Sequence, residues 1–291
     1  MDYHQDRFED FSLLVFKNKE LVAILPANIY KGNLHSHQGL SYGGLVLNAK
    51  SKLPEVIECY KHVLKFLNEQ SIESLHIKLL PTIYYSLPSD EIDYILFKTK
   101  AKKIRCDIAS VVENSNIIPI NSSNRKRGFS RAKTHNLVVK ETDNFQQFWN
   151  EILIPNLNER YNVNPVHSLE EITKLKTNFP KNIRQFNVFY NDELIAGVTI
   201  FETNTVAHVQ YISANDKKQE LGSLDALFYY LINKVFFNKK YFDFGISNEN
   251  DGQNINEGLL YWKESFGARS ISHEFYEIET INHNFLDSVF I

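Results

Sequence analysis

The sequence predicts a mixed α/β protein made of two similar halves. Its 291 residues are close to twice the roughly 150 residues expected of one domain. A nine-residue motif recurs, because residues 15–23 read VFKNKELVA and residues 188–196 read VFYNDELIA, with six identical positions. In both halves the motif is followed by a predicted strand, helix and strand in the same order. An internal repeat with conserved element order indicates a duplicated folding unit.

Each copy of the motif reads as a β-hairpin. Two apolar runs are joined by Asn18-Lys19 in the first copy and by Asn191-Asp192 in the second. A two-residue polar turn between apolar runs is typical of a tight hairpin. We therefore expect hairpins over residues 12–30 and 184–203.

The segments after each hairpin also correspond. In the first half we expect a glycine-rich strand over 42–47, a helix that opens at Pro54 and a strand over 75–80. In the second half we expect a strand over 206–213, a helix capped by Ser223 and a strand over 241–246. Apolar residues recur along the second helix at the helical period. They are Leu224, Leu227, Phe228, Leu231, Ile232, Val235 and Phe236.

Further elements flank the second hairpin. Residues 145–153 and a stretch from Ser168 predict helices, the latter opened by the capping box of Ser168 and Glu171. Pro155 is expected to end or kink the first of these helices. Residues 254–266 predict a helix stopped at Gly267, and residues 270–279 predict a final strand. The composition changes over 114–133, so we expect domains over 1–120 and 121–291.

The composition excludes several classes of protein. Apolar residues make up 43% and charged residues 23%, with only 11 Gly and 8 Pro, which excludes collagen-like and disordered chains. The formal net charge of −3 and the pI near 6.4 argue against a nonspecific nucleic-acid coat, and no DNA partner is expected.

The expected location is the cytoplasm. Cys59 and Cys106 cannot form a disulfide framework or a cysteine zinc site, which favours a reducing compartment. The first six residues lack the basic start and apolar run of a signal peptide. No stretch approaches the ~18 consecutive apolar residues of a membrane span.

The most specific stretch is YFDFGIS at 241–247, continued by NINEGLLYWKESFGA at 254–268. The chain resembles the FemAB-like branch of the GNAT superfamily of N-acyltransferases. The resemblance lies in this stretch, in the order of elements, in the segment GLSYGG at 39–44 and in the arginine-rich entry to the second half. The resemblance implies two tandem GNAT-like domains, the first degenerate, each a mixed, mostly antiparallel sheet flanked by helices.

The resemblance also implies a reaction. It would move an acyl group from acetyl-CoA or another acyl-CoA to the amine of an amino sugar or a cell-envelope polysaccharide precursor, without a metal. The acceptor would be a small molecule or a nucleotide- or lipid-linked sugar. One alternative is a FemAB-type aminoacyltransferase that uses aminoacyl-tRNA. A second alternative is a binding module that has the fold but no catalytic activity.

The resemblance places the donor on a turn. The segment QELGSL at 219–224 resembles the acyl-CoA loop of the superfamily, although Leu224 stands where a small residue is expected. Backbone N–H groups at a helix N-terminus favour pyrophosphate oxygens. The implied donor-binding residues are Ile212, Gln219, Leu221, Gly222 and Ser223. The alternative is an ordinary strand-to-helix turn.

Asp243 is the first candidate for a catalytic base. It lies between Phe242 and Phe244 in a strand that should be central. An unpaired carboxylate there would cost several kcal/mol, so Asp243 needs a partner or a raised pKa. The alternative to a catalytic role is a structural ion pair with Lys263 or a nearby arginine.

Glu257 and Tyr261 are two further catalytic candidates on the following helix. Glu257 would activate the amine, and Tyr261 is the residue nearest to the family's leaving-group acid, although the alignment puts Trp262 at that point. Solvated surface positions are the alternative for Glu257 and Lys263.

The expected acceptor-binding residues are His37, Tyr42, Gly43, Arg125, Tyr211, Asn254 and Lys263. His35 and His37 lack further metal ligands at a telling spacing, so sugar or nucleotide binding with Tyr42 as a platform is favoured over zinc. The alternative is a plain glycine-rich turn. Asn254 belongs to an asparagine-rich loop that would bind sugar hydroxyls or serve only as turns.

One basic patch stands out. It consists of Arg125, Lys126, Arg127, Arg131 and Lys133. Such a patch would meet the phosphates of a nucleotide- or lipid-linked sugar, of CoA or of a tRNA. A solvated linker face is the alternative.

Overall fold

The computed structural model describes residues 2–4 and 6–291, which form two compact units. Unit 1 holds the chain up to Asp107 together with Ser272–Ile291, and unit 2 holds Ile108–Ile271. Met1 and Gln5, which belong to the segment without a signal-peptide pattern, lie outside the described residues. These bounds differ from the expected 1–120 and 121–291 because the last strand of the chain, β16, pairs with β7 of unit 1.

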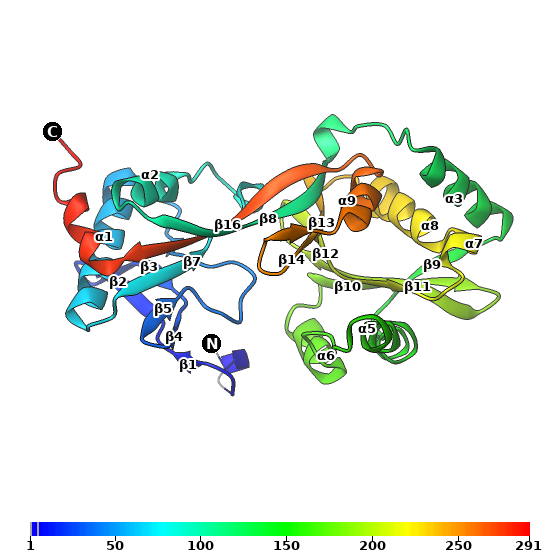
Figure 1. The fold of residues 1–291 in the computed structure, drawn as a ribbon, viewed down its shortest axis with the longest axis horizontal. Helices are drawn as coiled ribbons and strands as arrows, with labels where there is room; N and C mark the ends of the chain where they lie inside the picture. Colours follow the sequence, from blue (N-terminus) through cyan, green and yellow to red (C-terminus); the bar gives the residue numbers. More distant parts are fainter. Residues whose placement is uncertain (1, 5) are drawn as a thin grey trace. The chain divides into compact units, whose positions relative to one another are not determined.

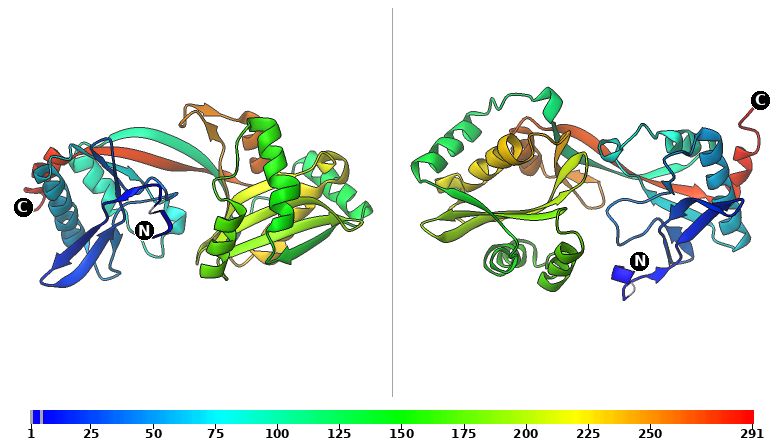
Figure 2. Two further views of the ribbon diagram at one scale, coloured as in Figure 1. Left: turned by 90° about the horizontal axis from the view of Figure 1, so that it is seen from below. Right: turned by 180° about the vertical axis from the view of Figure 1, so that it is seen from behind.

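Unit 2 is a mostly antiparallel sheet with helices on both faces, which confirms the predicted fold class. Its strand order is β8-β13-β12-β11-β10-β9, and only β12 and β13 are parallel. Helices α3, α7 and α8 lie on one face, and α5 and α6 lie on the other (Figures 1 and 2).

The strands of unit 2 are β8 (Lys102–Glu113, which begins in unit 1), β9 (Val138–Thr142), β10 (Ile183–Tyr190), β11 (Glu193–Glu202), β12 (Val206–Ala214), β13 (Tyr241–Ile246), β14 (Asn248–Glu249) and β15 (Asn254–Ile255). Its helices are α3 (Ser123–Thr134), α4 (Gln146–Phe148), α5 (Ile154–Tyr161), α6 (Leu169–Asn178), α7 (Lys218–Leu221), α8 (Ser223–Tyr230) and α9 (Glu257–Glu264). Helical π turns at Trp149–Leu153 and Leu231–Val235 extend α4 and α8, and a 3-10 turn spans Asn114–Asn116.

Unit 1 contains the sheet order β1-β4-β5-β7-β16-β8 and a separate sheet β2-β3-β6. Its strands are β1 (Glu9–Asp10), β2 (Leu13–Lys17), β3 (Glu20–Leu25), β4 (Asn28–Tyr30), β5 (Asn33–His35), β6 (Val46–Leu47), β7 (Ser74–Lys78) and β16 (Arg269–Glu279, which begins in unit 2). Its helices are α1 (Leu53–Glu69) and α2 (Glu91–Lys98), with 3-10 turns at Asp2–His4, Thr82–Tyr84 and Thr280–Leu286. One apolar core, which includes Leu64 and Leu75, holds unit 1 together.

Both predicted hairpins are confirmed. Asn18, Lys19, Asn191 and Asp192 all have positive φ, as a two-residue turn with matching strand twist requires. The capping box of α6 is also confirmed, because Ser168 Oγ accepts from Glu171 N and Glu171 Oε2 accepts from Ser168 N.

Several expected boundaries were wrong. Residues 123–134 are a helix rather than a linker, because Ser122 caps it by accepting from Arg125 N. The strand expected over 42–47 shortens to β6, and the helix expected over 254–266 begins only at Glu257. Pro155 does not end its helix, because the π turn before it lets Pro155 stand in the first turn of α5. None of the helices formed by residues 2–4 and 6–291 combines the length and apolarity needed to cross a membrane.

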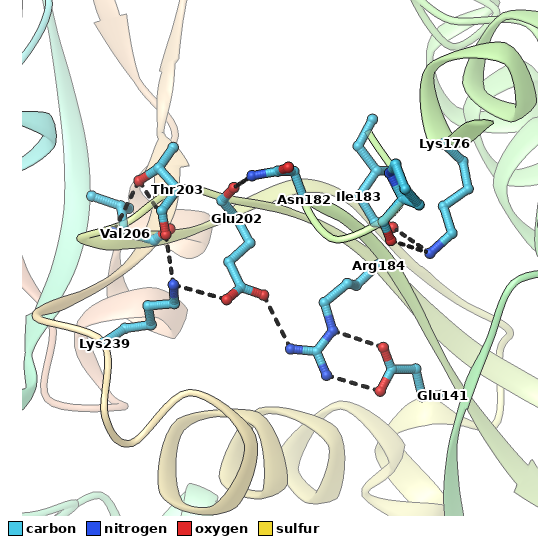
Figure 3. Close-up of polar contacts among 10 residues, drawn as sticks. Glu141, Lys176, Asn182, Ile183, Arg184, Glu202, Thr203, Val206 and Lys239 are labelled. Carbon is cyan, nitrogen blue, oxygen red and sulfur yellow. Dashed lines mark hydrogen bonds and ion pairs between the residues drawn. The ribbon is translucent and has the colours of Figure 1, made fainter. Parts of the chain in front are cut away.

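Arg184 joins β9 to the rest of the unit 2 sheet (Figure 3). Its Nε and Nη2 donate to the two carboxylate oxygens of Glu141 at 2.7 and 2.8 Å, and its Nη1 donates to Glu202 at 3.1 Å. The guanidinium also lies over the rings of Phe186 and Phe236, at 5.1 and 4.9 Å from their centroids.

We expect Arg184→Lys to lower the free energy of unfolding by about 1–3 kcal/mol. A lysine ammonium cannot reproduce the paired donors to Glu141, and each hydrogen bond to a charged group contributes in this range. Urea denaturation measures the change. The exposed Arg127→Lys is the matched control and should stay within about 0.5 kcal/mol of the parent. Equal effects of the two substitutions would contradict a structural role for the Arg184 pairs.

Candidate active site

The two parallel strands of unit 2 separate partway along their length. β12 and β13 pair only through Val206–His208 and Tyr241–Asp243. Beyond that point the register of β12 against β11 shifts between Thr199 and Ile200, and the register of β13 against β8 shifts after Asp243. The strands therefore diverge and leave backbone groups between them without a ladder partner. A ligand finds room and hydrogen-bonding groups at such a point.

His208 and Asp243 sit at the point of divergence. His208 Nδ1 lies 2.8 Å from Asp243 Oδ2, and Asp243 Oδ1 accepts from Gly245 N at 2.7 Å. The Asp243 side chain is fully buried, whereas the His208 side chain is 19% exposed. A neutral imidazole that donates its Nδ1–H to this carboxylate keeps a lone pair on Nε2. This arrangement can remove a proton from a bound group.

Lys263 is a structural part of the same site. It is buried, and its Nζ donates to the carbonyl oxygens of Gly245 and Ile246 at 3.0 and 2.6 Å. Burial lowers the pKa of Lys263 from 10.5 to about 8, while the charge of Asp243 raises it. The charge of Asp243 therefore acts on Lys263, while Asp243 Oδ2 lies within hydrogen-bond distance of His208 Nδ1. The amine of Lys263 holds the end of β13 in place.

Tyr211 lies on the same sheet face as His208. Their partners in β11, Thr199 and Phe201, are two residues apart and so point to one side. The Tyr211 hydroxyl accepts from His167 N at 3.0 Å and lies 2.6 Å from His167 Nδ1. Tyr211, predicted to bind the acceptor, thereby fixes the segment before α6 against this face of the sheet.

The other residues predicted on and before α9 are at the surface. Glu257 and Tyr261 are exposed, the Tyr261 side chain by 60%. Trp262 packs edge-to-face on Phe244, with ring centroids 5.7 Å apart, so it belongs to the core. Asn254 accepts a hydrogen bond from Asn250 at 2.8 Å, and Asn256 caps α9. The asparagines of this loop thus make the turn interactions that were one of the two expectations.

The predicted donor turn is packed beneath α3. Gly222 has φ +71°, and a Cβ on it would lie 2.1 Å from the backbone oxygen of Gly128 in α3. Leu221 and Ser223 are buried, Gln219 is exposed, and Ile212 packs partly against the core. Ser223 is not the helix cap, because it is the first residue of α8 and its buried Oγ meets no partner among the described residues.

The basic patch divides into a buried and an exposed face of α3. Arg125 donates to Asp225 in α8 at 2.5 Å and stacks on Phe266 at 5.4 Å, so its role in the structure is an ion pair. Burial raises the pKa of Asp225, which Arg125 and Arg131 oppose. The exposed cations are Lys126, Arg127 and Lys133.

We expect Gly222→Ala to lower the free energy of unfolding by about 2 kcal/mol or more. The left-handed backbone costs a non-glycine residue about 1–3 kcal/mol, and the new methyl group would displace Gly128. Thermal or urea unfolding measures the loss. Gly258→Ala in α9 is the matched control, because only Asn256 approaches its Cβ, at 3.8 Å, and alanine should be neutral or stabilising there. A neutral Gly222→Ala would contradict the close packing of α3.

The remaining predicted acceptor-binding residues lie in unit 1. His37 is buried, and its Nδ1 accepts from Gly39 N at 3.1 Å. Burial lowers the pKa of His37. Tyr42 lies edge-to-face against His273, with centroids 5.2 Å apart. A Cβ on Gly43 would lie 1.9 Å from Ser36 O, so this position requires glycine for packing.

No group of three or more His, Cys, Asp or Glu suitable for a metal ion is found among residues 2–4 and 6–291. Cys59 and Cys106 are free thiols. Burial raises the pKa of Cys59, which disfavours its thiolate.

Three solved structures have a similar fold. FemX matches with a TM-score of 0.65 at 10% identity, over 94% of this chain and 89% of FemX. L-PGS from Bacillus licheniformis matches with a TM-score of 0.60 at 10% identity, over 94% of this chain and 88% of L-PGS. A conserved protein of unknown function from Bacteroides thetaiotaomicron matches with a TM-score of 0.59 at 9% identity, over 95% and 87% of the two chains.

The sequence comparisons give no family. No protein-family model matches the chain, and no curated protein matches it. At 9–10% identity the structural matches establish the fold alone. The chain therefore shares the fold of FemX and L-PGS over nearly its whole length.

Proposed function

We propose that the protein is an acyltransferase that moves an acyl group from an activated donor to an amine, with His208 as the general base. The observation that carries this proposal is the hydrogen bond of 2.8 Å between His208 and Asp243 at the point where β12 and β13 separate. Its fold, which it shares with FemX and L-PGS, supports a transferase.

The His208–Asp243 pair suits attack by an amine. An ammonium group has no lone pair, so the acceptor must lose a proton before or during attack on the donor carbonyl. Asp243 holds the proton of His208 on Nδ1, and Nε2 of this partly exposed side chain then takes the proton from the acceptor. The negative charge of Asp243 also stabilises the imidazolium that forms.

Backbone groups would stabilise the developing oxyanion. β12 residues beyond His208 pair with β11 on one side and have no β13 partner on the other. An N–H group of this open edge can donate to the donor's carbonyl oxygen as it becomes negative. Positioning and electrostatics of this kind need few side chains.

The first donor candidate is an acyl-CoA, and the acceptor is an amino sugar or a cell-envelope precursor. The exposed Gln219 and the turn into α8 support a CoA site near the open end of β12. The packing of α3 over Gly222 and the burial of Leu221 leave only part of this turn for a diphosphate.

The second candidate is an aminoacyl-tRNA donor. The observation that favours it is the exposed face of α3, the helix that packs over this turn through Gly128, which carries Lys126, Arg127 and Lys133. Exposed lysine and arginine side chains bind a phosphate backbone without reading its sequence.

The test supplies each donor in labelled form. The purified chain is incubated with radiolabelled acetyl-CoA or with tRNA charged with radiolabelled amino acids, in each case with UDP-glucosamine as the amine. We expect one donor to label the amine, and Asp243→Asn to abolish this labelling. The exposed hairpin variant Asp192→Asn is the matched control and should keep the activity. Binding of a donor without transfer to any amine would favour the binding module over the enzyme.

A further inference from the structure

Unit 1 has a groove at a place that unit 2 fills with its own chain. A groove of about 720 Å³ runs between β2 and α1. All residues of β2 line it, and one stripe of α1 faces them, including Cys59, His62 and Phe66. The ion pair of Lys17 and Glu55, at 2.8 Å, joins the two walls.

The strand along this groove is an edge strand. The sheet order β2-β3-β6 gives β2 one strand neighbour, β3, among the described residues. The preceding strand β1 pairs with β4 and so does not cover β2. An edge strand presents backbone N–H and C=O groups that can pair with another chain.

The internal repeat shows what occupies the same place in unit 2. There β9 pairs antiparallel with β10, the counterpart of β2, with Val139 opposite Val188. In the repeat, Val188 corresponds to Val15. Transferring the pairing places a strand along residues 12–16 of unit 1, and residues 13–16 line the groove.

Exposure agrees with a missing strand. Phe186 and Val188 in unit 2 are at most 1% exposed, whereas their counterparts Leu13 and Val15 are only half-buried. On the other side of β2, Leu14 and Phe16 are 57% and 56% exposed. Apolar side chains exposed together on one edge strand indicate a surface that is covered by a partner.

We propose that this groove binds an extended peptide segment of a partner protein. The segment would add an antiparallel strand to β2, and alternate side chains would enter the space between β2 and α1. Main-chain hydrogen bonds supply affinity in this mode, and the pockets for alternate side chains supply specificity. This proposal does not depend on the transferase activity.

The chemistry of β9 indicates what the segment carries. Leu137, which directly precedes β9, and Val139 of β9 pack against the core of unit 2, and Glu141 pairs with Arg184. Unit 1 has Phe11 at the position that corresponds to Arg184, so an acid would have no partner there. Glu58 also lines the groove. The expected ligand is therefore aliphatic at three alternate positions and carries no acidic residue among them.

Two fluorescein-labelled peptides test the proposal on the full chain. The first is NLVVKETD, the sequence of residues 136–143, and the second is NLVVKVTD. Fluorescence anisotropy should show saturable binding that is at least about threefold tighter for the second peptide, because it buries an aliphatic group in place of an unpaired acid. A peptide with Val139→Pro should bind more weakly, because it loses a central donor.

A matched pair of variants locates the site. Phe16→Lys should weaken binding by at least about tenfold, because the added strand would also cover the outer side of β2, where an ammonium would replace the aromatic ring of Phe16. Phe97→Lys should change nothing, since Phe97 is 75% exposed on α2 and lies outside the groove. Both positions are exposed, so circular dichroism should show that both variants are folded.

Hydrogen exchange decides between the possible occupants. Peptide binding should slow hydrogen exchange at amides 13–17 in the parent protein but not in Phe16→Lys. This result would support the proposal. Protection of these amides that grows with protein concentration in the absence of peptide would identify a second copy as the occupant and overturn it. Absence of saturable binding by either peptide would overturn it as well.

Discussion

Replacing Asp243 by asparagine is expected to lower the rate of transfer about 10²–10⁴-fold with little change in donor binding. The asparagine Oδ1 can still accept from Gly245 N, but its amide donates to His208 Nδ1 where the carboxylate accepts. The imidazole must then carry its proton on Nε2, and a protonated Nε2 cannot take a proton from the acceptor. Steady-state kinetics with saturating donor measure the loss.

Two further variants separate catalysis from folding in this experiment. His208→Ala should lose activity to a similar degree, and added imidazole should restore part of it, because the partly exposed position leaves room for a free base. The double variant of Asp243→Asn and His208→Ala should have a rate of transfer no lower than that of either single variant, since both substitutions remove the same function. If the fall in rate of Asp243→Asn only followed a fall in the folded fraction, Asp243 would be a structural residue.

The sequence predicts one member of this pair and not the other. Asp243 stands out because two phenylalanines flank it in an apolar strand, so its carboxylate needs a partner. The partner depends on the parallel register that sets His208 beside Asp243, which lies 35 positions further along the chain. A single histidine in an apolar strand was the only local signal. Register between non-sequential strands is decided by packing, which a local pattern does not contain.

Helix α3 shows the same limit. Its basic composition reads as a solvated linker, yet Gly128 and Ala132 are its buried residues. Their small size lets α3 approach α8 so closely that Gly222 and Gly128 touch. The hairpins, by contrast, were predictable because their turn residues carry the backbone conformation locally. Local chemistry thus predicts the tight turns and the capping box of α6, and contacts between distant elements require the structure.

The second large effect concerns Lys263 and pH. The pKa of Lys263 is about 8 in the folded protein, because the side chain is buried, and 10.5 in the unfolded chain. Between these two values the unfolded state binds more protons than the folded state, so this residue makes the protein more stable as pH rises from about 8 to 10.5. A neutral amine keeps two N–H donors, which match the two carbonyls of Gly245 and Ile246. The shift corresponds to about 3 kcal/mol.

Urea denaturation from pH 7 to 11 of the parent and of Lys263→Met isolates this contribution from the other groups that titrate there. The stability difference between the two proteins should be nearly constant below pH 8 and then grow in favour of the parent by about 3 kcal/mol. Lys234→Met is the matched control, because Lys234 is exposed. The difference in free energy of unfolding between the parent and Lys234→Met should not change with pH. A flat difference for Lys263→Met as well would mean that the attraction of Asp243 offsets the cost of burial. Lys263 would then remain an ammonium beside the base, and His208 would act within a cationic site.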